Sequence, residues 1–411
     1  MKKLLLIYML LAGCGAVYAQ KYLVDDADTK LKEACAKQQI DMMKLNEAWR
    51  NIQDAMASEK SVNYHETYNV AAKIRNVQLV QLYDNGQRTG QLDTLRYFDG
   101  LKEILGYYYI YERLIHTPNA KGKLPMKEAE IKAAHILTQQ SAAPIRLNML
   151  RGGSSVIHSH AKKGLEYIDA YLKSFDEPLF SEMKLNETDT LKTAGYLYYG
   201  MGLKHLAQNW EDTLKYLEYY EKTLETPAYA AYSCVELMNN YKTHGDMLNW
   251  EKYCKYALEH FPDDQQYAKL LIAQYMNDER IDDAVKMCET MEKMFPQEIF
   301  PLETRALITF NDKKYEESVE LFKKLSELDP TYGRAWCSLG TSYYQLALKN
   351  SGNMNLRKEY LNKAIPAFKK AEEVAPDEPD LWGYYLYHCY EALPTPDKVN
   401  MAKYKKYDTK M

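Results

Sequence analysis

Four prolines recur at a nearly constant spacing in the second half of this chain. Pro262, Pro296, Pro330 and Pro376 each follow an amphipathic segment, and the intervals between them are 34, 34 and 46 residues. The last interval is one period lengthened by an insertion. A period near 34 is typical of antiparallel helix pairs stacked side by side, because a single pair cannot bury its own apolar face. The spacing therefore predicts an all-α chain built as an α-solenoid.

The segments before these prolines carry the same apolar stripe. In one segment the stripe consists of Ile281, Ala284, Val285, Cys288 and Met291. At the same positions of the next segment stand Tyr315, Ser318, Val319, Phe322 and Leu325. Apolar residues that recur with a period near 3.6 indicate the buried face of a helix. We therefore expect the second helix of each pair to pack through this stripe.

The most regular unit matches one repeat family at every consensus position. The matching residues are Trp336, Leu339, Gly340, Tyr343, Ala364, Phe368, Ala371 and Pro376. The unit resembles the tetratricopeptide repeat, whose pattern is W-x2-L-G-x2-Y, then A-x3-F, then A-x4-P. The resemblance covers roughly two-thirds of the chain. It implies a right-handed superhelix of antiparallel helix pairs with a concave groove.

The chain is expected to have four parts. Residues 1–19 form a signal peptide and residues 20–143 an N-terminal helical segment, either degenerate repeats or a cap. The repeat array occupies residues 144–393, and residues 394–411 form a C-terminal capping helix. In the second part we expect a polar turn at Asp84-Asn85-Gly86, with Asn85-Gly86 and Gly90 supplying the left-handed conformations of the reversal. We also expect a helix from Met126 to Gln140 that stops before Pro144.

The N-terminus has the layout of an export signal. Lys2 and Lys3 precede an apolar run from Leu4 to Leu11, and small residues lead to Ala19. Cleavage after Ala19 predicts a soluble protein in the bacterial cell envelope. A second interpretation stays open, since Leu11-Ala12-Gly13-Cys14 resembles a lipobox. Acylation of Cys14 would then anchor the protein to a membrane, so the expected location is periplasmic or associated with the outer membrane.

Composition and short motifs argue against several other classes of protein. The formal net charge of −4 disfavours nucleic acid as a partner. Beyond the signal, no stretch has enough consecutive apolar residues to predict a transmembrane segment. His158-x-His160 lacks a nearby third ligand, so we predict no metal site. Gly152-Gly153-Ser154-Ser155 lacks the lysine of a phosphate loop. We therefore predict neither a cofactor nor catalytic residues, and the chain is not expected to be an enzyme.

The family resemblance supplies a candidate binding surface. Its groove is formed by fixed positions of each first helix, which here are Phe300, Glu303, Leu307, Phe310, Arg334, Thr341, Tyr344, Gln345, Tyr387 and Tyr390. Aromatic side chains offer large contact areas to an extended ligand. The competing interpretation is that several of these rings only pack between repeats.

The resemblance and the export signal together favour a scaffold or adaptor. We expect it to bind another protein or peptide through an aromatic-rich concave groove in the cell envelope. The alternative is a glycan-binding surface protein similar to the SusD-like family, which also combines export, helix pairs and aromatic platforms. This chain departs from that family because its repeats are far more regular and because no lipoprotein linker follows Cys14.

Overall fold

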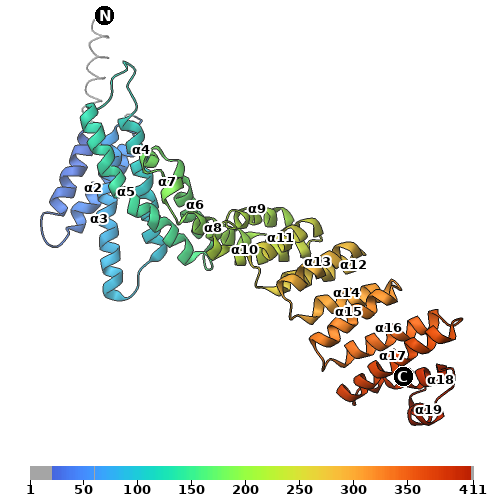
Figure 1. The fold of residues 1–411 in the computed structure, drawn as a ribbon. Coiled ribbons are helices and arrows are strands. Elements are labelled where there is room, and N and C mark those ends of the chain that lie inside the picture. The colour runs from blue at the N-terminus through green and yellow to red at the C-terminus, as the bar shows by residue number, and fades with distance from the viewer. Residues whose placement is uncertain (1–20, 60, 409–411) are drawn as a thin grey trace, which may run out of the picture. The chain divides into compact units, whose positions relative to one another are not determined.

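The computed structural model describes residues 21–59 and 61–408 of the chain (Figure 1). Every regular element in these ranges is a helix, so the predicted all-α fold class is confirmed. The chain forms two compact units, and the boundary between them along the chain lies between Asn240 and Tyr241. The predicted signal peptide and Cys14 lie outside the described residues.

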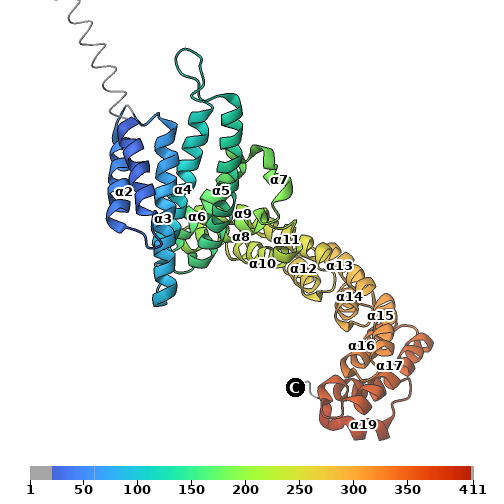
Figure 2. The ribbon, with the colours of Figure 1, turned by 90° about the vertical axis from the view of Figure 1, so that its left-hand side faces the viewer.

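The first unit begins with a bundle of long helices, which Figure 2 shows side by side. Residues 21–34 are helical, and the elements that follow are α2 (Met42–Ala57), α3 (His65–Thr89), α4 (Thr94–Ile115) and α5 (Glu128–Val156). Residues 21–34, α2 and α3 share a core around Leu45, Ile52 and Ile74. Further on, α4, α5 and the next helices share a second core around Ile104 and Met149.

The remaining elements of the first unit are shorter. They are α6 (Ala161–Lys173), η1 (Ser174–Asp176), η2 (Pro178–Met183), α7 (Leu185–Thr188), α8 (Lys192–Leu206) and α9 (Trp210–Glu221). Helix α10 (Pro227–Thr243) contains the boundary between the units. A buried ion pair joins Arg146 of α5 to Asp189. The Arg146 guanidinium also lies 4.5 Å from the ring centroid of Tyr171, so this cation is enclosed by its own chain.

Two helix interruptions predicted in the first unit are wrong, because the helix continues at both positions. Helix α3 continues through Asn85 and Gly86, and the reversal comes at Gly90, whose φ of 71° is left-handed. Gly86 lies inside the helix and permits close packing against Leu92, because an added Cβ would come within 2.9 Å of the Leu92 backbone. Only the packed structure shows this close approach.

Helix α5 likewise continues through Pro144 instead of stopping before it. A proline inside a helix costs about 3 kcal/mol, because it removes one hydrogen bond and its ring crowds the preceding turn. Buried apolar residues on both sides of the proline offset that loss, among them Ala142, Ile145 and Met149. The predicted start of the array at residue 144 thus falls inside α5.

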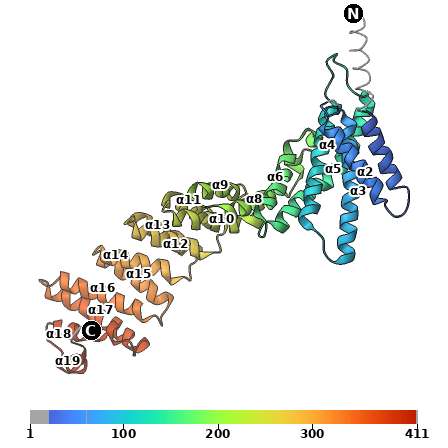
Figure 3. The same cartoon turned by 180° about the vertical axis from the view of Figure 1, so that it is seen from behind.

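The second unit consists of helix pairs that follow one another in chain order (Figures 1 and 3). Its elements are α11 (Met247–His260), α12 (Gln265–Asn277), α13 (Ile281–Met294), α14 (Ile299–Asn311), α15 (Tyr315–Leu328), α16 (Gly333–Lys349), α17 (Met354–Val374), η3 (Pro379–Leu381), α18 (Gly383–Ala392), α19 (Lys398–Tyr404) and η4 (Lys405–Tyr407). The even-numbered helices α12, α14, α16 and α18 are the first helices of their pairs. Three of them begin at Gln265, Ile299 and Gly333, which confirms the predicted 34-residue period.

The turn conformation inside three successive pairs repeats with the same period. Gly245, Glu279 and Lys313 all have positive φ, at 79°, 59° and 60°. The structure also explains the 46-residue interval between Pro330 and Pro376, because the insertion lengthens both helices of the pair α16 and α17. Helix α16 has 17 residues against 13 in α14, and α17 has 21 against 14 in α15.

The cores between these helices follow most of the predicted stripe, but Ile281 is 39% exposed because it stands at the first position of α13, beyond the packed part of the helix. Ala284, Cys288 and Met291 are buried in α13, and Phe322 and Leu325 are buried in α15. All six described cysteines are free thiols. Burial raises the pKa of the Cys288 thiol to about 12, so this cysteine acts as a small apolar side chain.

Candidate partner-binding face

The predicted groove residues lie on the first helices of the second unit, and polar and aromatic contacts connect these helices. Lys269 of α12 pairs with Glu298, which immediately precedes α14, at an Nζ–Oε2 distance of 3.2 Å. The same Nζ lies 5.8 Å from the ring centroid of Phe300. Phe300 therefore sits beside the preceding first helix and is half-buried there.

A similar contact connects the next two first helices. The hydroxyl of Tyr332, just before α16, donates to Glu303 Oε1 of α14 over 2.7 Å. Burial and this carboxylate raise the pKa of Tyr332 to about 12, so the phenol stays protonated and remains a donor. Arg334 follows at the start of α16 and is exposed to solvent.

Apolar side chains between these contacts remain open to solvent. Leu307 on α14 is 43% exposed and Met276 on α12 is 37% exposed. Phe310, one turn after Leu307, is half-buried, because its ring packs edge-on against Tyr315 with centroids 5.3 Å apart. We call the surface formed by Met276, Phe300, Glu303, Leu307 and Arg334 the first-helix face.

The predicted residues further along α16 are mostly engaged within the chain. Tyr344 packs edge-on against Tyr385 of α18 at 6.3 Å, and burial raises the pKa of Tyr344 to about 12. The hydroxyl of Thr341 donates to the Cys337 carbonyl of its own helix. Gln345 is half-buried beside them.

Tyr387 and Tyr390 belong to the core and do not line an open surface. Their exposed fractions are 5% and 7%. Tyr390 stacks on Tyr404 of α19 with centroids 6.1 Å apart, and the Tyr387 hydroxyl accepts from Lys405 Nζ at 3.2 Å. Tyr404 of α19 and Lys405 of η4 thus contact these two rings, which are too buried to serve a partner.

The two minor motifs also have structural roles. Gly152 and Gly153 lie inside α5, where an added Cβ would collide with Phe98 or Ile168, so these glycines permit close helix packing. His158 lies in the turn before α6, as predicted, and its Nδ1 is 2.9 Å from Nε2 of His205 on α8. The sequence offers no signal for this second histidine, since it stands 47 positions away.

No other described cluster has the chemistry of a metal site. Within residues 21–59 and 61–408, no three His, Cys, Asp or Glu side chains are arranged to hold a metal ion. The same ranges contain no helix that is long and apolar enough to cross a membrane.

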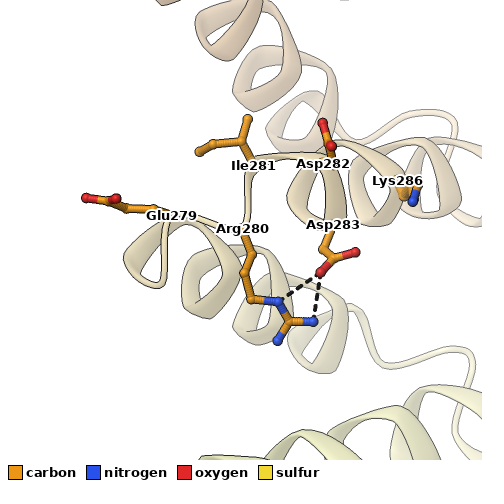
Figure 4. A pocket seen from close by; sticks show the side chains of 6 residues that line it. All are labelled: Glu279, Arg280, Ile281, Asp282, Asp283 and Lys286. Carbon is orange, nitrogen blue, oxygen red and sulfur yellow. Dashed lines mark hydrogen bonds and ion pairs between the residues drawn. The ribbon is translucent and has the colours of Figure 1, made fainter.

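Figure 4 shows an open depression at the turn between α12 and α13. Its volume is about 420 Å³, and its lining residues are Glu279, Arg280, Ile281, Asp282, Asp283 and Lys286. Arg280 is already engaged, because it donates to Glu251 over 2.6 Å and to Asp283 over 2.8 Å. Hydrogen bonding from Arg280 lowers the pKa of the Glu251 carboxyl to about 2. This network connects α11 to the turn between α12 and α13.

Comparisons with known proteins give structural neighbours only. No family model matches the chain, and neither does any curated protein. Among solved structures, MamA AMB-1 is 21% identical with a TM-score of 0.30, covering 46% of this chain and 94% of its own. YrrB, described as a TPR protein with an unusual peptide-binding site, is 18% identical with a TM-score of 0.30, covering 48% and 93%.

A third neighbour is the C-terminal part of a TPR repeat-containing protein from Cytophaga hutchinsonii. It is 17% identical with a TM-score of 0.37, and the match covers 62% of this chain and 93% of that one. The assignment of the repeats rests on the chain itself, through the 34-residue helix pairs and the complete consensus match in the unit that begins at Gly333. The second unit consists of helix pairs with a 34-residue period, and its most regular pair resembles the tetratricopeptide repeat at every consensus position.

Proposed function

We propose that this chain is a binding scaffold and that the first-helix face of its second unit holds a segment of another protein. The observation that carries the proposal is the exposure of Leu307 and Met276 on neighbouring first helices. Leu307 follows Glu303 by four residues on α14, and Glu303 and Phe300 are already engaged by Tyr332 and Lys269.

The chemistry of this face suits an extended or helical peptide. An apolar side chain of the partner would cover Leu307 and the open part of Phe300, and burial of apolar area supplies the main driving force. Arg334 and the Lys269–Glu298 pair stand at its edges, where charges fix orientation more than they add affinity. Because Lys269 and Tyr332 hold their partners before binding, little side-chain ordering remains to oppose association.

We propose further that the scaffold works in the bacterial cell envelope. The support is the sequence of residues 1–19, with its two lysines, apolar run and small-residue end. Fractionation of cells expressing the full chain tests this location. Metabolic labelling with an azido fatty acid tests acylation, because label on this protein would favour Cys14 as an anchor and no label would favour cleavage after Ala19.

Site-specific photo-crosslinking in cells tests the binding face. A photo-reactive residue at Leu307 should give a discrete adduct with one partner. A matched probe at Leu248, which is 82% exposed on α11 of the same unit, should give none. Equal adducts at both positions, or no adduct at Leu307, would remove the first-helix face as a specific site.

A charge substitution tests the same face with purified components. Leu307→Glu should weaken binding of the crosslinked partner by about tenfold or more, because it places a carboxylate where an apolar side chain is covered. Leu248→Glu is the control and should leave affinity unchanged. The proposal includes no catalytic step. Tyr387 is buried, so its ring cannot stack against a sugar as the glycan-binding alternative requires.

A further inference from the structure

A row of rings and lysines belongs to the first unit, whereas the first-helix face belongs to the second. It comes from η1, from α8 and from the end of α9, and its members are Phe175, Lys192, Tyr196, Tyr199, Tyr219 and Lys222. We call it the lysine–tyrosine row. Its rings are half-buried and Lys222 is exposed, so the row forms part of the surface of this unit.

Each of the two ammonium groups lies near two aromatic rings. Lys192 Nζ is 4.8 Å from the ring centroid of Phe175 and 5.8 Å from that of Tyr196. Lys222 Nζ is 5.4 Å from Tyr196 and 4.5 Å from Tyr219. A cation within about 6 Å of a ring centroid is attracted to the ring face. The two charges are therefore held in place along one line of rings.

These lysines differ from their neighbours in having no carboxylate partner among the described residues. In the same unit, Lys173, Lys204 and Lys215 each pair with a carboxylate of their own chain. Lys192 instead donates to the neutral amide oxygen of Asn186. Lys222 stands four residues after Glu218, a spacing that permits a helical ion pair, yet its side chain lies over the rings.

The tyrosines of the row are fixed and uncharged. Tyr199 and Tyr219 pack with ring centroids 4.7 Å apart, and Tyr196 lies 6.1 Å from Tyr219. Burial raises the pKa of Tyr199 and of Tyr219, so both phenols stay neutral at physiological pH. The nearby Asp169 is paired with Lys173 at 2.8 Å. Among the described residues, neither lysine therefore has a carboxylate partner in an ion pair.

We propose that the lysine–tyrosine row is a second binding surface, which takes an acidic segment of a partner protein. Carboxylates of that segment would meet Lys192 and Lys222, while its apolar side chains cover the ring edges between them. The rings already exclude some water from the ammonium groups, so exchanging the remaining water for a carboxylate loses less hydration than at a fully solvated lysine. Complementary charge is the argument for this occupant, and it does not depend on the first-helix face.

Selection from a phage-displayed library of random short peptides on the purified protein tests the proposal. The peptides that depend on this row should be rich in Asp and Glu, and the best of them is then synthesised for fluorescence anisotropy. The double substitution Lys192→Gln and Lys222→Gln should weaken its binding by about tenfold. The double substitution Lys204→Gln and Lys215→Gln removes the same charge from paired lysines, and affinity should stay within about twofold.

Three results would overturn the assignment. The first is that no acidic peptide is enriched, and the second is that the Lys192→Gln, Lys222→Gln protein binds it with unchanged affinity. The third is that only an acidic polysaccharide such as polygalacturonate binds in a lysine-dependent way, because the row would then serve a glycan. Leu307→Glu should leave the peptide's affinity unchanged, so this test can succeed or fail separately from that of the first-helix face. Far-UV circular dichroism checks that each variant is folded.

Discussion

At the scale of single residues, close packing leaves no room for added atoms at the helix crossing between α16 and α17. A Cβ at Gly340 would lie 2.8 Å from the ring of Phe368, which is fully buried. Gly340→Ala should therefore lower the free energy of unfolding by about 1 to 3 kcal/mol through overpacking. Gly352→Ala is the control, since nothing lies within 4 Å of its Cβ position. Urea unfolding curves that coincide for the two variants would contradict this packing.

Glu251 makes the stability of the second unit depend on pH. The pKa of Glu251 is about 2 in the folded protein, well below its ordinary value, chiefly because Arg280 donates to it. A depressed carboxyl pKa stabilises the fold above the unfolded-state value near 4.5, and this contribution disappears as the pH falls toward 2.

Stability should accordingly fall between pH 4.5 and 2, and part of that fall should be absent in Glu251→Gln. We expect a difference of about 1 kcal/mol, because Arg280 is partly exposed and solvent weakens the pair. Urea titrations of both proteins across this pH range measure it. Parallel pH profiles would show that the network contributes no pH-dependent stability.

At the scale of elements, three successive turns inside helix pairs place a residue in the left-handed conformation at intervals of 34 positions. The first of these residues is Gly245, whereas Glu279 and Lys313 adopt the same conformation with a side chain. Gly245→Ala should cost about 1 to 2 kcal/mol, the usual penalty for a non-glycine residue at positive φ. Lys313→Gly at the equivalent turn should not destabilise the protein by a similar amount. Thermal unfolding compares the two, and equal losses would argue against a shared turn geometry.

At the scale of the whole molecule, a stack of helix pairs is stable only where its last apolar face is covered. In the second unit that cover is α19, whose Tyr404 is fully buried against Trp382 and Tyr390. The Tyr404 hydroxyl also donates to Glu372 Oε2 of α17 over 2.8 Å. The closing helix is thus tied to both preceding helices.

Deleting residues 398–411 should expose this face and loosen the unit from its C-terminal end. Amide hydrogen exchange should lose protection first in α18 and α17, whereas α12 and α13 keep theirs, because each pair depends mainly on its neighbours. Tyr404→Phe is a milder control, which retains the ring and removes only the hydroxyl bonds. Unchanged exchange in α18 after the deletion would show that α19 is not a cap.

The sequence by itself determined the helix pairs, their period and their buried stripe. These features follow from local rules, because apolar spacing and turn residues act over a few positions along the chain. The starts of α12, α14 and α16 could be predicted for this reason, and so could the positions of Cys288 and Phe322 in the core.

Only the tertiary structure decided which helices continue and which rings stay exposed. Helix α5 passes through Pro144 because neighbouring helices bury both sides of it, and Tyr390 is covered because α19 folds back onto it. Leu307 remains open although it occupies the same kind of groove position as Tyr390. Such outcomes depend on contacts between residues far apart in the chain, which no local pattern records. A match to the consensus therefore predicts where a residue lies in the repeat. The packing around that residue determines whether its side chain is exposed to a partner.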